Sequence, residues 1–215
     1  MEDIITVEKI AVFANGVIED YDALLPDVKG YGQYIAVDGG LCHCAPLGVT
    51  PLFLVGDEDS VNPDDVKKFP GIKRITSKQD KDETDLELAL SFLMKKNPQS
   101  ITIFGGWGGR IDQALTNLIL LSRYPGKVFL ETEKEIIGAI DQSIELGTFP
   151  GQIVSLIPLN GPAMGITTDG LKWELKEGDL DKSFVGVSNE ATQSAICVSV
   201  KSGDLLFSLS KGNVS

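Results

Sequence analysis

Acidic side chains and glycines gather at a few points of this 215-residue chain. The clusters occupy residues 38–40, 56–60, 80–85 and 105–112. Three of them directly follow short apolar runs typical of buried strands, at residues 34–37, 52–55 and 101–104. Ligands of an open parallel sheet bind at the carboxyl ends of its strands, so we expect these side chains to meet at that edge. Repeated carboxylates there predict a divalent-metal site, and the adjoining glycines predict a phosphate site.

Asp57 and Asp59 are candidate metal ligands. Residues two apart on an extended segment project to the same side, so both carboxylates can face one ion. Magnesium prefers such hard oxygen ligands, together with water and phosphate oxygens. A solvated acidic turn is the alternative for this pair taken alone. A calcium loop is excluded, because Lys68 stands where the bidentate glutamate would be required.

The segment 80–85 leads into a predicted helix. Thr84 and Glu87 have the spacing of a capping box, which places Asp85 at the first helical position. The helix dipole alone explains one carboxylate there. The further aspartates at positions 80 and 82 exceed what a cap needs, and Lys81 between them is a candidate phosphate ligand.

The glycine-rich loop at 105–109 is followed by another predicted helix, which is a common arrangement for phosphate binding. Arg110 excludes a P-loop, which requires Lys after the last glycine, and Ile111 excludes the dinucleotide-binding fingerprint. The Arg110 guanidinium matches the geometry of phosphate oxygens. Asp112 is open to two interpretations, as a helix cap or as a ligand-facing carboxylate.

Composition narrows the class of protein. A net charge of −12 argues against binding to nucleic acid, and no apolar run is long enough to span a bilayer. The first residues lack the basic region of a signal peptide, and the three cysteines make no disulfide framework, so we expect a cytoplasmic protein. Cys42, His43 and Cys44 fall short of the four ligands of structural zinc and are interpreted as part of a helix.

The hydrophobic pattern predicts two domains. Strand-like and helix-like segments alternate over residues 1–141, which indicates an α/β domain with a mostly parallel sheet. Short β-rich runs fill residues 142–215 and predict an antiparallel sandwich or barrel. The expected strands are residues 10–14, 34–37, 52–55, 72–75, 101–104, 127–130, 152–156, 164–168, 171–175, 195–200 and 205–209. Trp173 is expected in the core or at an interface, and Ser188 and Asn189 in a loop.

The order of the motifs resembles that of thiamin pyrophosphokinases over essentially the whole chain. The matching phrases are Asp38-Gly39-Gly40, Gly56-Asp57-x-Asp59-Ser60, Lys81-Asp82-Glu83-Thr84-Asp85, Gly105-Gly106-x-Gly108-Gly109-Arg110-x-Asp112-Gln113 with Asn117, and Gly186-x-Ser188-Asn189. Two positions depart from the family pattern, Glu58 where Phe is usual and Cys42 where Asn is common.

The resemblance implies an N-terminal ATP-binding domain, a C-terminal domain that helps to bind thiamin, and a homodimer with the thiamin pocket near the subunit interface. It implies transfer of pyrophosphate from ATP to the hydroxyl of thiamin, leaving AMP. Asp57, Asp59 and Asp85 would hold Mg²⁺, with Arg110 and Asp112 at the phosphate and acceptor site. Ser188 and Asn189 would contact thiamin. The positions it places around ATP are Asn15, Asp38, Gly39, Lys81, Thr84, Gly106, Gly109 and Gln113.

Two rival functions follow from the same residues. One is pyrophosphoryl transfer to another heterocycle that carries a hydroxymethyl group, such as a pterin. The other is a nucleotide-binding sensor without turnover, against which stands the presence of all three proposed metal ligands.

Overall fold

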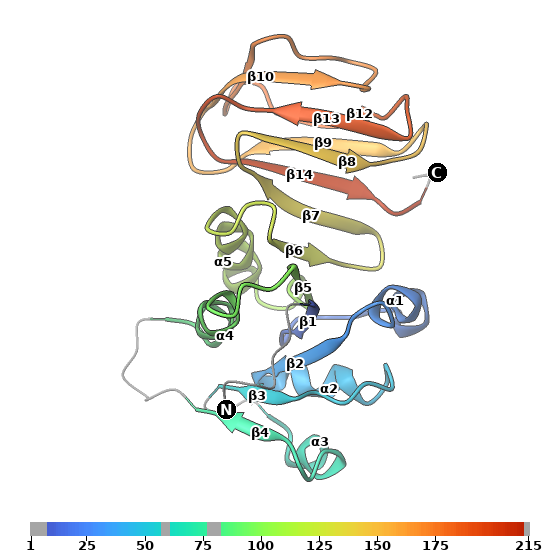
Figure 1. The fold of residues 1–215 in the computed structure, drawn as a ribbon, viewed down its shortest axis with the longest axis vertical. Helices are drawn as coiled ribbons and strands as arrows, with labels where there is room; N and C mark the ends of the chain where they lie inside the picture. Colours follow the sequence, from blue (N-terminus) through green and yellow to red (C-terminus); the bar gives the residue numbers. More distant parts are fainter. Residues whose placement is uncertain (1–7, 57–60, 77–82, 213–215) are drawn as a thin grey trace. The chain divides into compact units, whose positions relative to one another are not determined.

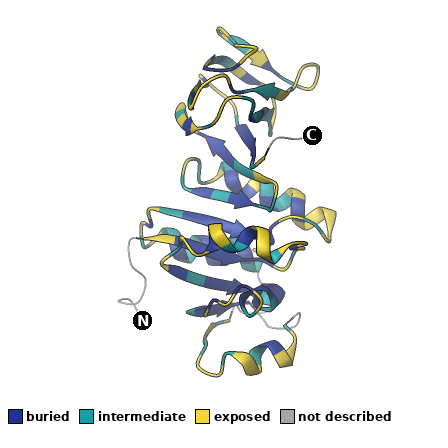
Figure 2. Ribbon diagram, turned by 90° about the vertical axis from the view of Figure 1, so that its right-hand side faces the viewer, coloured by how far each residue is buried: buried dark blue, intermediate teal, exposed yellow. Residues whose placement is uncertain are grey.

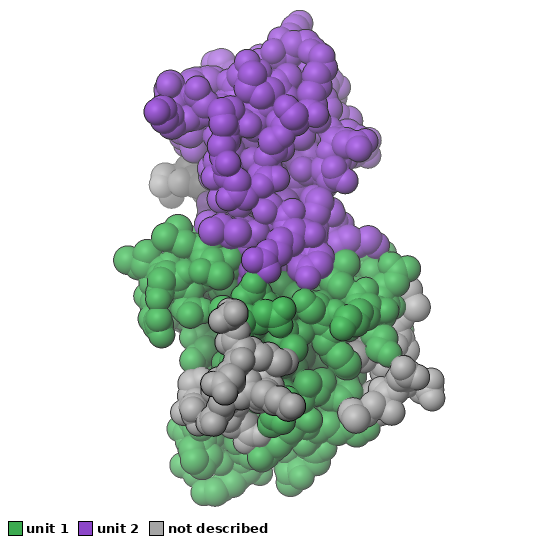
Figure 3. Space-filling view, turned by 90° about the vertical axis from the view of Figure 1, so that its left-hand side faces the viewer, with its two compact units in different colours: residues 1–117, 131–133 green, residues 118–130, 134–215 purple. Residues whose placement is uncertain are grey.

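The structure is a computed structural model that describes residues 8–56, 61–76 and 83–212 (Figure 1). The chain divides into two compact units (Figure 3). Unit 1 comprises Met1–Asn117 with Glu131–Glu133, and unit 2 comprises Leu118–Leu130 with Lys134–Ser215. Asp57, Asp59 and Lys81, which the sequence analysis assigns to the site, lie outside the described residues.

Unit 1 is built on a parallel sheet with the strand order β5-β1-β2-β3-β4. The strands are β1 (Lys9–Phe13), β2 (Gln33–Val37), β3 (Phe53–Val55), β4 (Lys73–Ile75) and β5 (Ser100–Phe104). In the centre, Val12 of β1 lies between Ile35 of β2 and Ile103 of β5. The predicted parallel α/β domain is confirmed, and each of its expected strands in this unit is present.

Helices connect these strands. They are α1 (Tyr21–Val28), α2 (Leu41–Cys44), α3 (Pro63–Lys68), α4 (Asp85–Met94) and α5 (Ile111–Ser122), with a 3-10 turn η1 at Asp38–Gly40. Asp20 caps α1 by accepting a hydrogen bond from the backbone N–H of Ala23 at 3.0 Å. Asn62 caps α3 in the same way, accepting from the N–H of Asp64 at 2.9 Å. The helix expected at Cys42–Cys44 is present as a single turn.

The core of unit 1 is formed by strands β1, β2, β3 and β5, which are mostly dark blue in Figure 2, and by apolar side chains of α1 and α2 that pack on them. Phe13 at the end of β1 stacks on Phe104 at the end of β5, with ring centroids 5.7 Å apart. Both rings are fully buried. The strand ends are therefore anchored in the core, and the loops that follow them start from fixed positions.

In unit 2, strands β12, β9, β14 and β7 pair antiparallel in that order, within the large mixed sheet in which β6 follows β7. Strands β11, β10, β13 and β8 form a second, antiparallel sheet in that order. The strands are β6 (Val128–Glu131), β7 (Glu135–Ile140), β8 (Ser143–Gly147), β9 (Ile153–Pro158), β10 (Ala163–Asp169), β11 (Gly178–Leu180), β12 (Gly186–Glu190), β13 (Ala195–Ser199) and β14 (Leu205–Ser210). Leu156 and Phe207 from one sheet join Ile166 and Ile196 from the other in a single buried cluster. The predicted antiparallel sandwich is confirmed.

Two local predictions in unit 2 are wrong, and a third is narrowed. Residues 171–175 form no strand, because Leu171 makes only one isolated bridge, to Ala191. Trp173 is 59% exposed and therefore lies outside the core, which leaves the interface half of that prediction standing as a prediction. Ser188 and Asn189 belong to strand β12 rather than to a loop, although the register shifts there and Ser188 has a φ of 59°.

Across the described part of the chain, no helix combines the length and the apolar character needed to cross a membrane.

Candidate functional site

A cavity of about 330 Å³ opens in unit 1 at the carboxyl ends of β1, β2 and β5 and at the first turn of α4. Its wall is made of loop backbone, small side chains and a few polar groups. The lining residues are Ala14, Asn15, Gly16, Val37, Asp38, Thr84, Asp85, Leu86, Gly105, Gly106, Gly108, Arg110, Gln113, Ala114 and Asn117. This is the edge of the sheet at which the sequence analysis expects a ligand.

The cavity brings together most of the predicted ATP-binding residues that the structure describes. Those that line it are Asn15, Asp38, Thr84, Asp85, Gly106, Arg110 and Gln113. Gly39 is buried and, like Gly109 and Asp112, is not part of the lining. Ser188 and Asn189 belong to unit 2.

Asp38 and Asp85 meet next to Gly56, the residue that follows β3. A Cβ atom at Gly56 would lie 2.0 Å from Oδ1 of Asp38 and 3.4 Å from Cγ of Asp85. Gly56 also has a φ of 135°, so a side chain there is excluded by both space and backbone. Carboxylates from two distant segments thus converge on the end of β3, directly before Asp57.

The convergence at Gly56 suits a hard cation, since carboxylate oxygens are the protein ligands that Mg²⁺ prefers. Within residues 8–56, 61–76 and 83–212, no three His, Cys, Asp or Glu side chains are close enough together to hold a metal ion. Asp57 and Asp59, the two other carboxylates assigned to the metal, fall outside these ranges. Among the described residues, the evidence that this site suits a cation is therefore the approach of Asp38 and Asp85 at Gly56.

The first turn of α4 is fixed by the predicted capping box. Oγ1 of Thr84 accepts a hydrogen bond from the N–H of Glu87 at 3.2 Å, and the Glu87 carboxylate accepts one from the N–H of Thr84 at 2.9 Å. Asp85 occupies the first helical position, as predicted. The cap therefore determines where the Asp85 carboxylate lies in the cavity wall.

Helix α5 supplies another part of the wall. Gln113, Ala114 and Asn117 are spaced so that they lie on one face of the helix, and Arg110 directly precedes its first residue. Asn117 is buried, and its side-chain N–H donates to the carbonyl oxygen of Gly106 at 2.8 Å. Asn117 belongs to the motif that resembles the family, but the predicted site gives it no role; its helical spacing from Gln113 is the signal that would have placed it in the cavity wall.

Arg110 forms an exposed, forked ion pair with Asp112. Nε of Arg110 donates to Oδ1 at 3.1 Å and Nη2 donates to Oδ2 at 2.6 Å. The hydrogen bond from Arg110 lowers the pKa of the Asp112 carboxyl, and the N–H of Gln113, 2.9 Å from Oδ1, acts in the same direction. Arg110 therefore lies at the edge of the cavity, with two N–H groups of its guanidinium directed at the carboxylate oxygens of Asp112.

The predicted thiamin contacts in unit 2 make hydrogen bonds within that unit. Oδ1 of Asn189 accepts from the N–H of Trp173 at 3.1 Å, and Nδ2 of Asn189 donates to the Trp173 carbonyl at 2.8 Å. The N–H of Ser188 donates to Oγ of Ser155 at 3.1 Å. Asn189 thus holds the backbone of Trp173 and leaves the indole ring exposed.

Comparison with known proteins gives matches over both parts of the chain. Residues 29–132 match the family described as thiamin pyrophosphokinase, catalytic domain, and residues 140–205 match thiamin pyrophosphokinase, vitamin B1 binding domain. Thiamine pyrophosphokinase of Bacillus subtilis is 30% identical over 204 residues, which cover 86% of this chain and 92% of that protein. Thiamine pyrophosphokinase 2 of Arabidopsis thaliana is 31% identical over 175 residues, covering 74% of this chain and 65% of that protein.

Solved structures of thiamin pyrophosphokinases have a similar fold. The crystal structure of the Bacillus subtilis thiamine pyrophosphokinase has a TM-score of 0.83 and 26% identity, covering 94% of this chain and 98% of the other. The structure of the enzyme from Geobacillus thermodenitrificans has the same TM-score with 25% identity, covering 97% of this chain and 99% of the other.

Proposed function

Because the chain belongs to the thiamin pyrophosphokinase family, we propose that it transfers the pyrophosphoryl group of ATP to the hydroxyl of thiamin, giving thiamin diphosphate and AMP. The observation that carries this proposal is the cavity at the strand ends of unit 1. It combines glycine backbone, a guanidinium and carboxylates, which are the groups that phosphoryl transfer requires.

The nucleotide is assigned to residues 1–141. The loop at Gly105–Gly108 and the polar side chains of Asn15 and Gln113 border the cavity and are available as hydrogen-bond donors to phosphate oxygens. Arg110 adds a cation whose fork matches two of those oxygens. Together with Thr84, Gly39, Gly109 and Lys81, these residues are proposed to place ATP.

Asp57, Asp59 and Asp85 are proposed to hold Mg²⁺. When bound, Mg²⁺ neutralises charge on the phosphate oxygens during transfer. The approach of Asp38 and Asp85 at Gly56 supports this assignment, since it brings carboxylates to the backbone that leads into Asp57.

The transfer joins the hydroxyl oxygen of thiamin to the β-phosphorus of ATP and breaks the bond from that phosphorus to the oxygen of AMP. The hydroxyl proton goes to a carboxylate. Asp112 becomes available for it when Arg110 turns from Asp112 to the phosphates, because the hydrogen bond that lowers the Asp112 pKa is then lost.

Thiamin is assigned to residues 142–215, with contacts from Ser188 and Asn189. Trp173, Phe184 and Val187 of unit 2 are large apolar side chains that are each more than half exposed, which supports the proposal of a homodimer with the thiamin pocket near its interface. The three cysteines are all unpaired, which is consistent with a cytoplasmic protein.

The test is incubation of the purified protein with ATP, MgCl₂ and thiamin, followed by separation of the products. We expect thiamin diphosphate and AMP in equal amounts, with no product when EDTA is present in excess over Mg²⁺. Thiamin monophosphate with ADP would refute the proposed transfer. A competition between thiamin and a hydroxymethyl pterin identifies the preferred acceptor, and light scattering reports the oligomeric state.

A further inference from the structure

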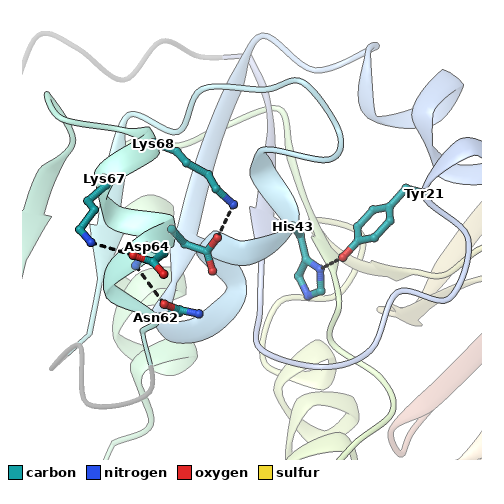
Figure 4. A network of polar contacts seen from close by, with 7 residues as sticks. Tyr21, His43, Asn62, Asp64, Lys67 and Lys68 are labelled. Carbon is teal, nitrogen blue, oxygen red and sulfur yellow. Dashed lines mark hydrogen bonds and ion pairs between the residues drawn. The ribbon is translucent and has the colours of Figure 1, made fainter.

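His43, the one histidine of the chain, is buried and contacts residues of the cavity wall without lining the cavity itself. It lies on α2 and is only 4% exposed. Its Nε2 is 3.1 Å from the carbonyl oxygen of Gly16, and its Nδ1 is 2.9 Å from the hydroxyl of Tyr21. Figure 4 shows the Tyr21 hydroxyl directed at the imidazole from α1. A buried histidine with both ring nitrogens engaged has a defined orientation and a defined proton position.

The partners of His43 determine its tautomer. A carbonyl oxygen can only accept a hydrogen bond, so the Gly16 carbonyl requires the proton on Nε2. In the neutral ring Nδ1 then carries the lone pair and accepts the hydroxyl hydrogen of Tyr21. Burial lowers the pKa of His43, which keeps the ring in this neutral form near pH 7.

The hydrogen bond from His43 acts on the backbone of the cavity wall. Gly16 lines the cavity, and its N–H donates to the carbonyl of Gly105, another lining residue, at 2.7 Å. The next residue, Val17, donates to the Trp107 carbonyl at 3.0 Å. A Cβ atom at Gly105 would lie 3.1 Å from Nε2 of His43. The imidazole therefore lies against both loops at the point where they are joined.

We infer that the Tyr21–His43 pair is a positioning device for the nucleotide: it holds the Gly16 carbonyl away from the cavity, so that this carbonyl presents no acceptor to the phosphates there. A carbonyl oxygen facing a phosphate would repel it, whereas a carbonyl bound to an imidazole N–H cannot turn. This inference rests on the proposed function, because it assumes that a phosphate occupies the cavity. His43 does not line the cavity and acts through the backbone of Gly16 and of its neighbour Ala14.

The first experiment observes the ring directly. With one histidine, a long-range ¹H–¹⁵N spectrum of the tag-free protein contains signals from His43 alone. We expect the Nε2–H tautomer at pH 7 and a titration below the ordinary pKa. The titratable groups facing the ring are Tyr21, Asp65 and Glu133, and none of them supplies an acceptor to Nε2. An Nδ1–H tautomer would overturn the inference.

The second experiment measures binding rather than turnover. The dissociation constants of a non-hydrolysable ATP analogue and of thiamin are determined for the wild type and for His43→Leu, His43→Gln, Tyr21→Phe and Tyr34→Phe. Tyr34→Phe is the matched control, because the Tyr34 hydroxyl donates to the carbonyls of Val28 and Tyr31, which are not in the cavity wall.

We expect His43→Leu to weaken the ATP analogue about tenfold, as the loss of one buried hydrogen bond allows, while thiamin affinity is unchanged. His43→Gln restores an N–H donor and should recover most of the affinity. Tyr21→Phe should weaken the analogue by about threefold, and Tyr34→Phe should have no effect.

Unchanged affinity of folded His43→Leu for the analogue would overturn the inference. If that variant does not fold, unchanged affinity of Tyr21→Phe would overturn it, as would failure of His43→Gln to recover. A wild type that binds the analogue but makes no thiamin diphosphate refutes the proposed reaction and leaves this inference standing. A wild type that does not bind the analogue refutes both.

Discussion

The side-chain amide of Asn117 donates a 2.8 Å hydrogen bond to the carbonyl oxygen of Gly106, joining the second turn of α5 to the glycine loop that precedes the helix. Both residues line the cavity, and both are buried. The helix thus holds in place the loop that is proposed to bind phosphate. Substitution of Asn117 should therefore change the affinity for the nucleotide by a measurable amount.

Asn117→Ala should raise the KM for ATP about tenfold and lower the free energy of unfolding by about 1–3 kcal/mol, because the buried Gly106 carbonyl loses its donor. Steady-state kinetics and urea denaturation measure the two effects. The control is Asn160→Ala, which removes an exposed amide bound to Asp204 in unit 2. Equal effects of the two substitutions would contradict the assignment.

Thr84→Ala removes the hydroxyl that caps α4 and should cost about 0.5–2 kcal/mol of stability. It should also lower kcat, since the cap determines the position of Asp85. Thr84→Ser keeps the oxygen and should behave like the wild type in both measurements. Loss of stability without any change in kcat would show that the first turn of α4 does not control the reaction.

Asp85→Asn should reduce kcat by at least about 10²-fold, which corresponds to a few kcal/mol of transition-state stabilisation. Stability should fall by at most about 1 kcal/mol, the value of a carboxylate at a helix N-terminus. Asp59→Asn is expected to reduce kcat similarly. The decisive measurement is kcat as a function of Mg²⁺ concentration, and normal turnover at saturating Mg²⁺ would remove the substituted residue from the set of ligands.

Arg110→Ala should lower kcat/KM by at least about 10²-fold, whereas Arg110→Lys should recover only part of the loss, because lysine supplies charge without the fork. Neither change should affect unfolding by urea by more than about 1 kcal/mol, since the ion pair with Asp112 is exposed to solvent. Full activity of Arg110→Lys would mean that charge alone is sufficient at this position.

The lowered pKa of His43 predicts how stability depends on pH. The unfolded chain takes up a proton on this ring near pH 6.5, whereas the folded chain does so only at a lower pH. The unfolded state therefore binds more protons over that interval, and the His43 contribution to stability falls as the pH drops from about 6.5 to the folded pKa.

Urea unfolding of the wild type and of His43→Gln between pH 5 and 8 checks this pH dependence. The stability of the wild type relative to the variant should be lower at pH 5 than at pH 8. Parallel curves for the two proteins would contradict the assigned shift.

The sequence was sufficient to predict the parallel sheet of unit 1, because buried parallel strands are apolar along their whole length and end at recognisable turns. Helices α1 and α3 were not predicted. Pro26 interrupts the pattern of α1, and α3 has only six residues, too few for a clear periodicity.

Unit 2 was harder to predict in detail. Strand β12 consists of Gly186–Glu190, whose small and polar residues resemble a turn, and it exists because β9 pairs with it. The apolar alternation at 171–175 was misleading, because the Asn189 amide binds the backbone of Trp173 and so occupies the groups that a strand partner would use. Both outcomes depend on contacts between distant residues, which local patterns do not contain.

In the candidate site, too, local patterns predicted some residues, whereas contacts between distant residues had to be seen in the structure. Motif residues such as Thr84 and Arg110 were predicted because their types suggest chemistry, and both line the cavity. Asn117 and His43 act on the backbone of the loops rather than on a ligand, and their roles became visible only with the hydrogen bonds to Gly106 and Gly16.

Gln113, Ala114 and Asn117 line the cavity from one face of α5, and this spacing limits the insertions that the helix can tolerate. One residue added between Gln113 and Asn117 would rotate everything beyond it by about 100° around the helix axis. The Asn117 amide would then face away from Gly106. The glycine loop would lose its hydrogen bond to the helix, although every original residue would still be present. Along this stretch, the count of residues matters as much as their identity.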